Sequence, residues 1–506
     1  MQKSELSKYR AQYDALKKDR AVWVSTWKQL ATYLAPTRGM FEGEIPNSGR
    51  RIDHKTLLDS SASLAVNTLG AGLMSGLTSP SRRWFDLTFC PPALSKLPGA
   101  GQWLENTKKA IESALAQSNL YCVLQSMYEE LAVFGTAAFL VEETPSGKIY
   151  FRPFTAGEYV LDVDEKGKVN TFGREFYMTP KQLADTFGPD ALPVSILQSL
   201  QKQENSCHKV IHLICPNKEF GMQELFSFAY HSLYFLEDGT LLRRSGYYEF
   251  PVVCARWETK TTADSYGRGP GWKCLGDVKM LQKMQKAKLV ALDKNTNPPV
   301  MVSASVQGEV NLLPGGITRC NSLTDAAIRP VYQVQPDLQS LDQAIEQVRQ
   351  TIRAHFFADV FVMLSSQEPS TMTAAEVAER RQEKMLLLGP IFQRLKTELL
   401  DPLIERVFDI LQRQGLLPPI PDYLQGIKLD VQYISTIAQA QRASMLEPLA
   451  QGIEWIKQLL NLNPALAGQI NYQQALAQGL ESLGVQNALL STPIEELEHE
   501  PKQIEG

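Results

Sequence analysis

The spacing of apolar residues predicts a helical start to the chain followed by a strand-rich middle. Trp23, Trp27 and Leu30 recur at helical intervals and predict a helix over residues 5–35, which ends before Pro36. Similar patterns predict helices over 55–77, 102–117 and 120–134. Alternating patterns broken by turn signals predict short strands over 84–89 and within 137–255.

Farther along, the pattern predicts two helices that flank a small strand-rich insert. The helices are expected over 272–297 and 337–361, and the insert lies at 300–335. The second helix begins at Asp337, a residue suited to capping a helix N-terminus. Its apolar residues alternate at intervals of three and four and form a seam for a neighbouring helix, which we interpret as a subunit contact: Leu338, Leu341, Ile345, Val348 and Ile352.

A loop is expected over 361–370, followed by a very long helix. Thr373 and Glu376 have the spacing of a capping box and open a helical pattern that reaches Gln414, with Gly415 as a stop. Kinks are expected where proline interrupts this pattern, at Gly389-Pro390 and Asp401-Pro402. Two further segments complete the chain: a weakly charged helical stretch over 432–493 and a loose acidic tail over 494–506.

The first helix of this pair, at 272–297, carries an unusual local charge. It contains six Lys and two Asp, a net charge of +4, in a chain whose formal net charge is −4. At 100° per residue, one narrow face holds Lys279, Lys283 and Lys286, with Lys294 close to it. A solvated helix face explains this stripe, and so does a surface that meets phosphates; the sequence leaves both open.

Composition places the chain among globular proteins and argues against several classes. With 44% apolar and 21% charged residues, a disordered or fibrous protein is excluded. The balance of 51 basic and 55 acidic residues argues against a protein that grips nucleic acid non-specifically. Seven scattered cysteines without a CxxC pair fit a reducing compartment, and we expect neither a secretory signal nor a membrane span.

The sequence offers no convincing catalytic or metal site. No phosphate-binding loop of the Walker type occurs, and the glycines at 267–271 are better explained as a turn before a helix. The best metal candidates are Cys207, His208, His212 and Cys215, but on one strand the two histidines and the two cysteines would face opposite sides. We therefore expect no enzyme, no cofactor and no metal.

Several stretches, taken in order, resemble the portal or head-to-tail connector proteins of short-tailed bacteriophages. The resemblance covers most of residues 20–440, and the ordered set is more specific than any one motif. The matching stretches are WKQLATY at 27–33 with Pro36, LGAGLMSGLTSPSRRWF at 69–85, FGTA at 134–137, GRGP at 267–270, NPP at 297–299, LPGG at 313–316, TMTAAEV at 371–377 with Arg380, LGP at 388–390 and GLLP at 415–418.

The resemblance implies an α+β, helix-rich, elongated subunit that assembles into a ring. It divides the chain into a wing (1–271), a first stem helix (272–297), a clip (298–336), a second stem helix (337–361), a tunnel loop (362–372), a long kinked wing helix with its following segment (373–431), a crown (432–493) and a tail (494–506). The DNA channel would then be lined by the lysine stripe and by Ser365, Ser366, Gln367 and Glu368.

The resemblance also implies a function without catalysis by this chain. Such rings usually contain twelve subunits at one capsid vertex of the virion, and double-stranded DNA passes through them. A separate terminase ATPase drives the DNA, tail adaptors dock on the ring, and capsid and scaffolding proteins surround it during assembly in the host cytoplasm. The alternative is a structural oligomeric adaptor without a channel, held together by the helices at 432–493.

Overall fold

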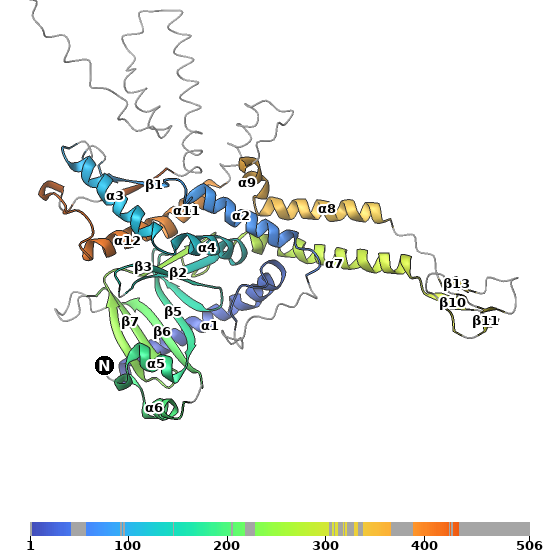
Figure 1. Cartoon of the computed structure of the whole chain (residues 1–506), viewed down its shortest axis with the longest axis horizontal. Coiled ribbons are helices and arrows are strands. Elements are labelled where there is room, and N and C mark those ends of the chain that lie inside the picture. Colours follow the sequence, from blue (N-terminus) through green and yellow to red (C-terminus); the bar gives the residue numbers. More distant parts are fainter. Residues whose placement is uncertain are drawn as a thin grey trace, which may run out of the picture.

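The computed structural model describes residues 3–434 except for fifteen stretches. Those stretches are 42–56, 92–93, 95–96, 145, 204–205, 218–227, 303–305, 308, 312–316, 318, 321–327, 332–336, 366–387, 425 and 427–428. Helices and strands both contribute, so the expected mixed fold is confirmed. Figure 1 shows a body of helices packed around sheets, from which two helices project side by side.

Two antiparallel sheets form the centre of the body, in the order β4-β5-β6-β7-β8 and β3-β2-β9. The larger sheet consists of β4 (Tyr159–Val163), β5 (Val169–Met178), β6 (His208–Pro216), β7 (Tyr230–Leu236) and β8 (Leu241–Tyr247). The smaller consists of β3 (Ile149–Phe154), β2 (Thr136–Glu143) and β9 (Val252–Arg256). The first six residues of β2 are all buried, which explains why this strand is a continuous apolar run rather than an alternating one.

Two short helices lie inside the region for which the sequence analysis predicted only strands. They are α5 (Pro180–Phe187) and α6 (Val194–Gln201), separated by the short η3 (Pro189–Ala191). Thr179 and Gln182 form a capping box at the start of α5, with Pro180 at its first position. The sequence therefore carried a signal for this helix, but at eight residues the helix is too short to show a clear apolar period.

The N-terminal helices form part of the body and confirm most of the expected pattern. They are α1 (Lys3–Leu34), α2 (Ser61–Leu77), α3 (Ala100–Ala116) and α4 (Leu120–Phe134). The helix expected from residue 55 begins instead at Ser61. Gly135 ends α4 with a φ of 81°, and a Cβ there would lie only 2.3 Å from the backbone nitrogen of Gly269. This glycine thus lets the backbone of Arg268 and Gly269 pack directly against the end of α4.

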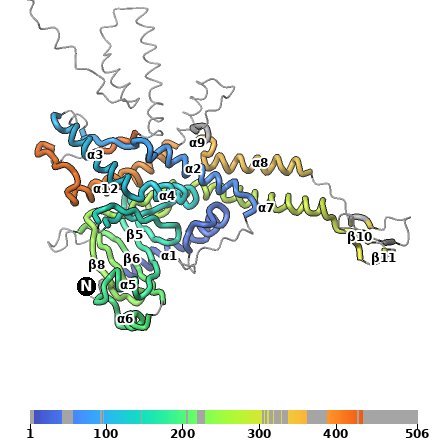
Figure 2. The backbone as a smooth tube through the Cα atoms, in the orientation of Figure 1, coloured from blue at the N-terminus to red at the C-terminus, as the bar shows by residue number. Residues whose placement is uncertain are grey.

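The two projecting helices, α7 (Pro270–Thr296) and α8 (Leu338–His355), are called the arm below. Figure 2 follows the backbone outward along α7 and back along α8. Asp337 caps α8 by accepting a hydrogen bond from the Ser340 amide at 3.0 Å, as expected. At the outer end lie four short strands: β10 (Val300–Val302), β11 (Val306–Gln307), β12 (Arg319–Cys320) and β13 (Ile328–Pro330).

The helix predicted over 337–361 is broken. It ends at His355, Phe357 adopts a φ of 53°, and α9 (Ala358–Ser365) then begins. The loop expected over 361–370 is therefore wrong for 361–365, which are helical, because an apolar stretch that packs on α2 continues there. The part of the expected loop beyond Ser365 lies outside the described residues.

The long C-terminal helix contains a π-helical turn directly before Asp401-Pro402, one of the two places where a kink was expected. It runs through α11 (Gly389–Leu395), a π turn (Lys396–Leu400) and α12 (Asp401–Arg413), and Gly415 follows with a φ of 67°. After the short η5 (Asp422–Leu424), β14 (Leu429–Tyr433) pairs antiparallel with β1 (Phe85–Phe89). Residues 432 and 433, the first two of the expected crown (432–493), thus belong to a strand of the body, and the crown from residue 435 onward lies outside the described residues.

Candidate functional site

The arm is the part of the chain on which the predicted functional residues converge. Its helices run antiparallel, because Asp277 pairs with His355 at 3.5 Å while Lys288 pairs with Asp342 at 2.5 Å. Of the predicted seam, Ile345 and Ile352 are buried within this single chain. The other three seam residues are half-buried, and a subunit contact through them stays a prediction: Leu338, Leu341 and Val348.

The four predicted lysines lie on the outer side of α7, and we call them the lysine face: Lys279, Lys283, Lys286 and Lys294. All four are exposed, whereas Val278 and Leu281 on the other side are fully buried. Lys279 donates a 2.5 Å hydrogen bond to Gln29 of α1, and its ammonium lies 5.8 Å from the Tyr33 ring. No described residue pairs with the other three, so three of the four ammonium groups remain available to an external anion.

A second exposed face of the arm was missed by the sequence analysis. On α8, four glutamines point outward, and we call them the glutamine face: Gln339, Gln343, Gln347 and Gln350. Their spacing of four, four and three residues places them on one side of a helix. This spacing was visible in the sequence, but uncharged polar residues on a helix do not by themselves suggest a partner. The arm thus presents one basic and one uncharged polar surface.

The remaining predicted channel and cap residues are only partly placed. Ser365 is the last residue of α9. Gly389 and Pro390 begin α11, with the proline in its first turn, where it costs no hydrogen bond. The other predicted residues lie outside the described part of the chain: Ser366, Gln367, Glu368, Thr373 and Glu376.

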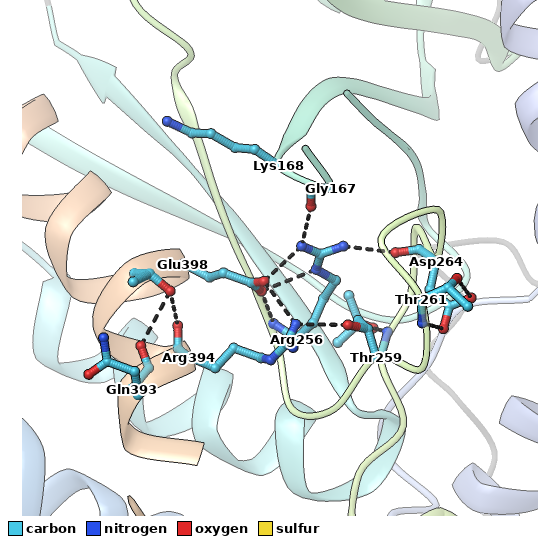
Figure 3. A network of polar contacts seen from close by, with 12 residues as sticks. Gly167, Lys168, Arg256, Thr259, Thr261, Asp264, Gln393, Arg394 and Glu398 are labelled. Carbon is cyan, nitrogen blue, oxygen red and sulfur yellow. Dashed lines mark hydrogen bonds and ion pairs between the residues drawn. The ribbon is translucent and has the colours of Figure 1, made fainter. Parts of the chain in front are cut away.

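The π turn places a carboxylate against the end of β9 and so connects the long helix to the sheet. Glu398 accepts hydrogen bonds from the Arg256 side chain at 3.1 and 2.7 Å and from its backbone amide at 2.9 Å (Figure 3). Arg256 is only 3% exposed and donates further to the carbonyl oxygens of Gly167 and Asp264. Arg394 also reaches Glu398, at 3.2 Å. A fully paired arginine of this kind supports structure rather than chemistry.

Next to this network lies a cavity of ≈ 510 Å³ between the sheets and α12. Its walls carry charges of both signs, among them Lys168, Glu249, Arg406 and Asp409. Burial and the negative charge of Glu249 raise the pKa of Asp409 to about 6. Glu249 itself pairs with Arg406 and Arg413. The cavity shows no nucleophile placed beside a base, so its geometry suggests no reaction.

The histidine and cysteine candidates do not form a metal site within the described residues. His212 is buried, its Nε2 lies 3.0 Å from the Ser232 hydroxyl, and its ring stacks on Tyr234 at 3.9 Å. Burial, aided by the charge of Arg174, lowers the pKa of His212 well below its usual value. No cluster of three or more metal-binding side chains occurs in the described part of the chain. Among the described helices, none is long and apolar enough to cross a membrane.

Comparison with known proteins identifies the family. The family model described as bacteriophage head to tail connecting protein matches residues 6–490. A protein described as "Probable portal protein" of Bordetella phage BPP-1 is 37% identical over 441 residues, covering 86% of this chain and 79% of its own. The "Portal protein" of Salmonella phage epsilon15 is 36% identical over 496 residues, covering 96% of this chain and 88% of its own.

A solved structure titled as the virion of a native gene transfer agent particle aligns with 83% of this chain and 89% of its own, at 10% identity and a TM-score of 0.34. That score is too low to support an argument, so the assignment depends on the family model and the curated relatives. Both extend across nearly the whole chain, including the body and the arm. This chain therefore belongs to the bacteriophage head to tail connecting protein family, the portal proteins.

Proposed function

We propose that this chain assembles into a ring of twelve copies at one capsid vertex and that double-stranded DNA enters and leaves through the ring. Besides family membership, one observation supports the proposal: a two-helix arm projects from the body (Figure 1). One face of the arm carries three lysines that pair with no described residue, and the other face carries glutamines. Repeated around a ring, the lysines would form a belt of positive charge, although the chain as a whole is slightly acidic.

In this proposal the body is the wing, the arm is the stem, and the strands at its outer end belong to the clip. Terminase and, later, tail adaptor proteins dock on the clip, while capsid and scaffolding proteins meet the wing during assembly in the host cytoplasm. The chain itself is not an enzyme, since terminase supplies the ATPase. Purified protein should therefore form rings with a central hole in negative-stain images and should hydrolyse no ATP.

The two faces of the arm allow a test of where DNA makes contact. Replacing Lys283, Lys286 and Lys294 by Gln removes three charges from the lysine face. Replacing Gln343, Gln347 and Gln350 by Glu changes the net charge equally on the glutamine face of the same arm. Lys279 is left unchanged because it contacts α1.

We expect both triple variants to form rings, and only the lysine variant to lose DNA packaging or retention. Each phosphate that the ring no longer neutralises should reduce the slope of log affinity against log salt by about 0.9, so the defect should depend on salt. Equal defects in both variants would point to net charge alone. A defect confined to the glutamine variant would place the DNA on the α8 side and refute contact through the lysine face.

A further inference from the structure

Asp59 occupies the junction between the body and the arm, just before α2. Its side chain is buried, with 5% of the residue exposed, at the point where the start of α2 meets both α7 and α8. Nothing in the sequence marks this residue, because an aspartate just before a helix resembles an ordinary capping group. Its structural partners show that it does more than cap.

Every element at this junction donates a hydrogen bond to the Asp59 carboxylate. Oδ1 accepts from the Ser61 amide of α2 at 2.8 Å. Oδ2 accepts from Gln285 of α7 at 2.9 Å and from Arg349 of α8 through Nε at 3.1 Å and Nη2 at 2.7 Å. One carboxylate therefore ties three helices together.

The backbone around Asp59 is fastened to α7 as well. The Gln282 side-chain oxygen accepts hydrogen bonds from the amides of Leu58 and Asp59, at 2.7 and 2.9 Å. The side-chain nitrogen of Gln282 donates to the Asp59 carbonyl oxygen at 2.8 Å. The segment at 57–60 is thus held to α7 by three hydrogen bonds that do not involve the carboxylate. The carboxylate adds a bond from Gln285 of α7 and the bonds from Arg349 of α8.

The ion pair with Arg349 is special among the contacts of α8. The other described ion pairs of this helix join it to α7 (Asp342 with Lys288, His355 with Asp277) or lie within it (Glu346 with Arg349 and with Arg353). Only the pair of Arg349 and Asp59 joins α8 to an element outside the arm, among the described residues. Burial alone would raise the pKa of Asp59, but its hydrogen bonds with Ser61, Arg349 and Gln285 outweigh burial and lower it to about 2.

We propose that Asp59 is a positioning residue that fixes α8, through Arg349, in its place against the body. The consequence for DNA depends on the conduit proposed above: the helix that carries the glutamine face, and the α9 segment that follows it, would be aligned by a side chain of the body. Hydrogen bonds to a buried charged group are among the stronger polar contacts in proteins. The bond between Arg349 and Asp59 joins residues that are 290 positions apart in the sequence.

The test compares two substitutions that each remove one ionic contact of α8. Asp59→Asn removes the tie to the body, whereas Arg353→Gln removes the contact between Arg353 and Glu346, which lies entirely within α8. In assembled full-length protein, we expect amide hydrogen exchange in α8 to become about tenfold faster in Asp59→Asn and to change little in Arg353→Gln. Exchange in the buried strand β6 serves as a reference and should not change, because a general loss of stability would affect both elements.

Arg349→Gln removes the same ion pair from its more exposed partner and provides a second route if Asp59→Asn does not fold. It also removes a contact with Glu346, and Arg353→Gln, which removes the other ionic contact of Glu346, is the control for that loss. Arg349→Gln should reproduce the faster exchange of α8, and combining it with Asp59→Asn should add little to either one. Exchange in α8 that is the same in Arg349→Gln and Arg353→Gln would overturn the proposal, as would an equal acceleration in β6. Packaging is measured separately: loosened α8 with normal packaging would count against the conduit role while leaving the positioning role intact.

Discussion

Gly72 is the position at which α2 makes room for α9, and its replacement by alanine tests how closely the two helices pack. A Cβ at this position would lie 2.2 Å from Cγ and 2.3 Å from Cδ1 of Phe361, whose side chain is buried. Ordinary contacts between carbon atoms are about 3.5–4.0 Å, so the ring would have to move by more than about 1 Å. The ring cannot easily move, because it is held by the helix on which it lies and by the surrounding core.

The expected cost follows from two opposing effects. Overpacking of a core typically costs about 1–3 kcal/mol, while replacing glycine by alanine within a helix gains up to about 1 kcal/mol. Gly72→Ala should therefore lower the free energy of unfolding by about 1–2 kcal/mol. Gly276 provides a matched control, since it also lies within a helix, α7, and a Cβ there would meet nothing within 4 Å. Gly276→Ala should be stabilising by about 0.5–1 kcal/mol.

Urea denaturation of the full-length protein measures both effects, and hydrogen exchange in α9 locates the first. We expect a lower midpoint and faster exchange in α9 for Gly72→Ala, and a higher midpoint for Gly276→Ala. Phe361→Ala should be destabilising alone but should cost less in the Gly72→Ala background, because the clash disappears with the ring. If Gly72→Ala were as stable as Gly276→Ala, the close packing of α9 on α2 would be wrong.

Two further predictions concern the ion pair of Glu398 with Arg256 and the neighbouring cavity, which Asp409 lines. Glu398→Gln leaves the buried Arg256 guanidinium without its carboxylate, so it should lower the free energy of unfolding, measured by urea denaturation, by about 3 kcal/mol. Glu405 is an exposed acid on α12, and Glu405→Gln should change this free energy by less than about 0.5 kcal/mol. A carboxyl whose pKa is raised in the folded state contributes stability at low pH and loses it as the pH rises through that pKa, so Asp409, with its pKa of about 6, should destabilise the protein above pH 6. Asp409→Asn should therefore raise the free energy of unfolding at pH 7.5 by about 1–2 kcal/mol, after allowance for solvent screening. This gain in stability should be smaller at pH 5. A gain that is the same at both pH values would contradict the raised pKa of Asp409.

Helices and strands were predicted best where the apolar pattern along the sequence is uninterrupted. The helix at the N-terminus, the first arm helix and the strand expected at 84–89 were confirmed, and the second arm helix was confirmed as far as His355. The break between α8 and α9 could not be foreseen, because Phe356 and Phe357 continue an apolar pattern and contain no glycine or proline. Its cause is tertiary: Phe361 must turn to reach the surface left open by Gly72.

The same distinction applies to the candidate site. The lysine face was found because charge and helical period are both local properties of the sequence. Asp59 and Arg349 were not paired, since their contact depends on how a short segment before α2 meets a helix 290 residues later. The π turn could not be predicted from the sequence either. Its backbone hydrogen bonds join residues five apart, and this change does not alter the spacing of the apolar residues.

The pairing of β1 with β14 has a consequence for the synthesis of the protein. Phe85–Phe89 finds its partner only in Leu429–Tyr433, at the far end of the described chain. At roughly 5–20 residues per second, a ribosome needs on the order of 20–70 s to produce the intervening segment. During that interval the newly made strand, with its apolar Phe85, Leu87 and Phe89, has no strand to pair with. Pairing of β1 with β14 is thus among the last steps of folding. A nascent chain that ends before Leu429 would leave unpaired the backbone edge of β1 that β14 covers in the finished subunit.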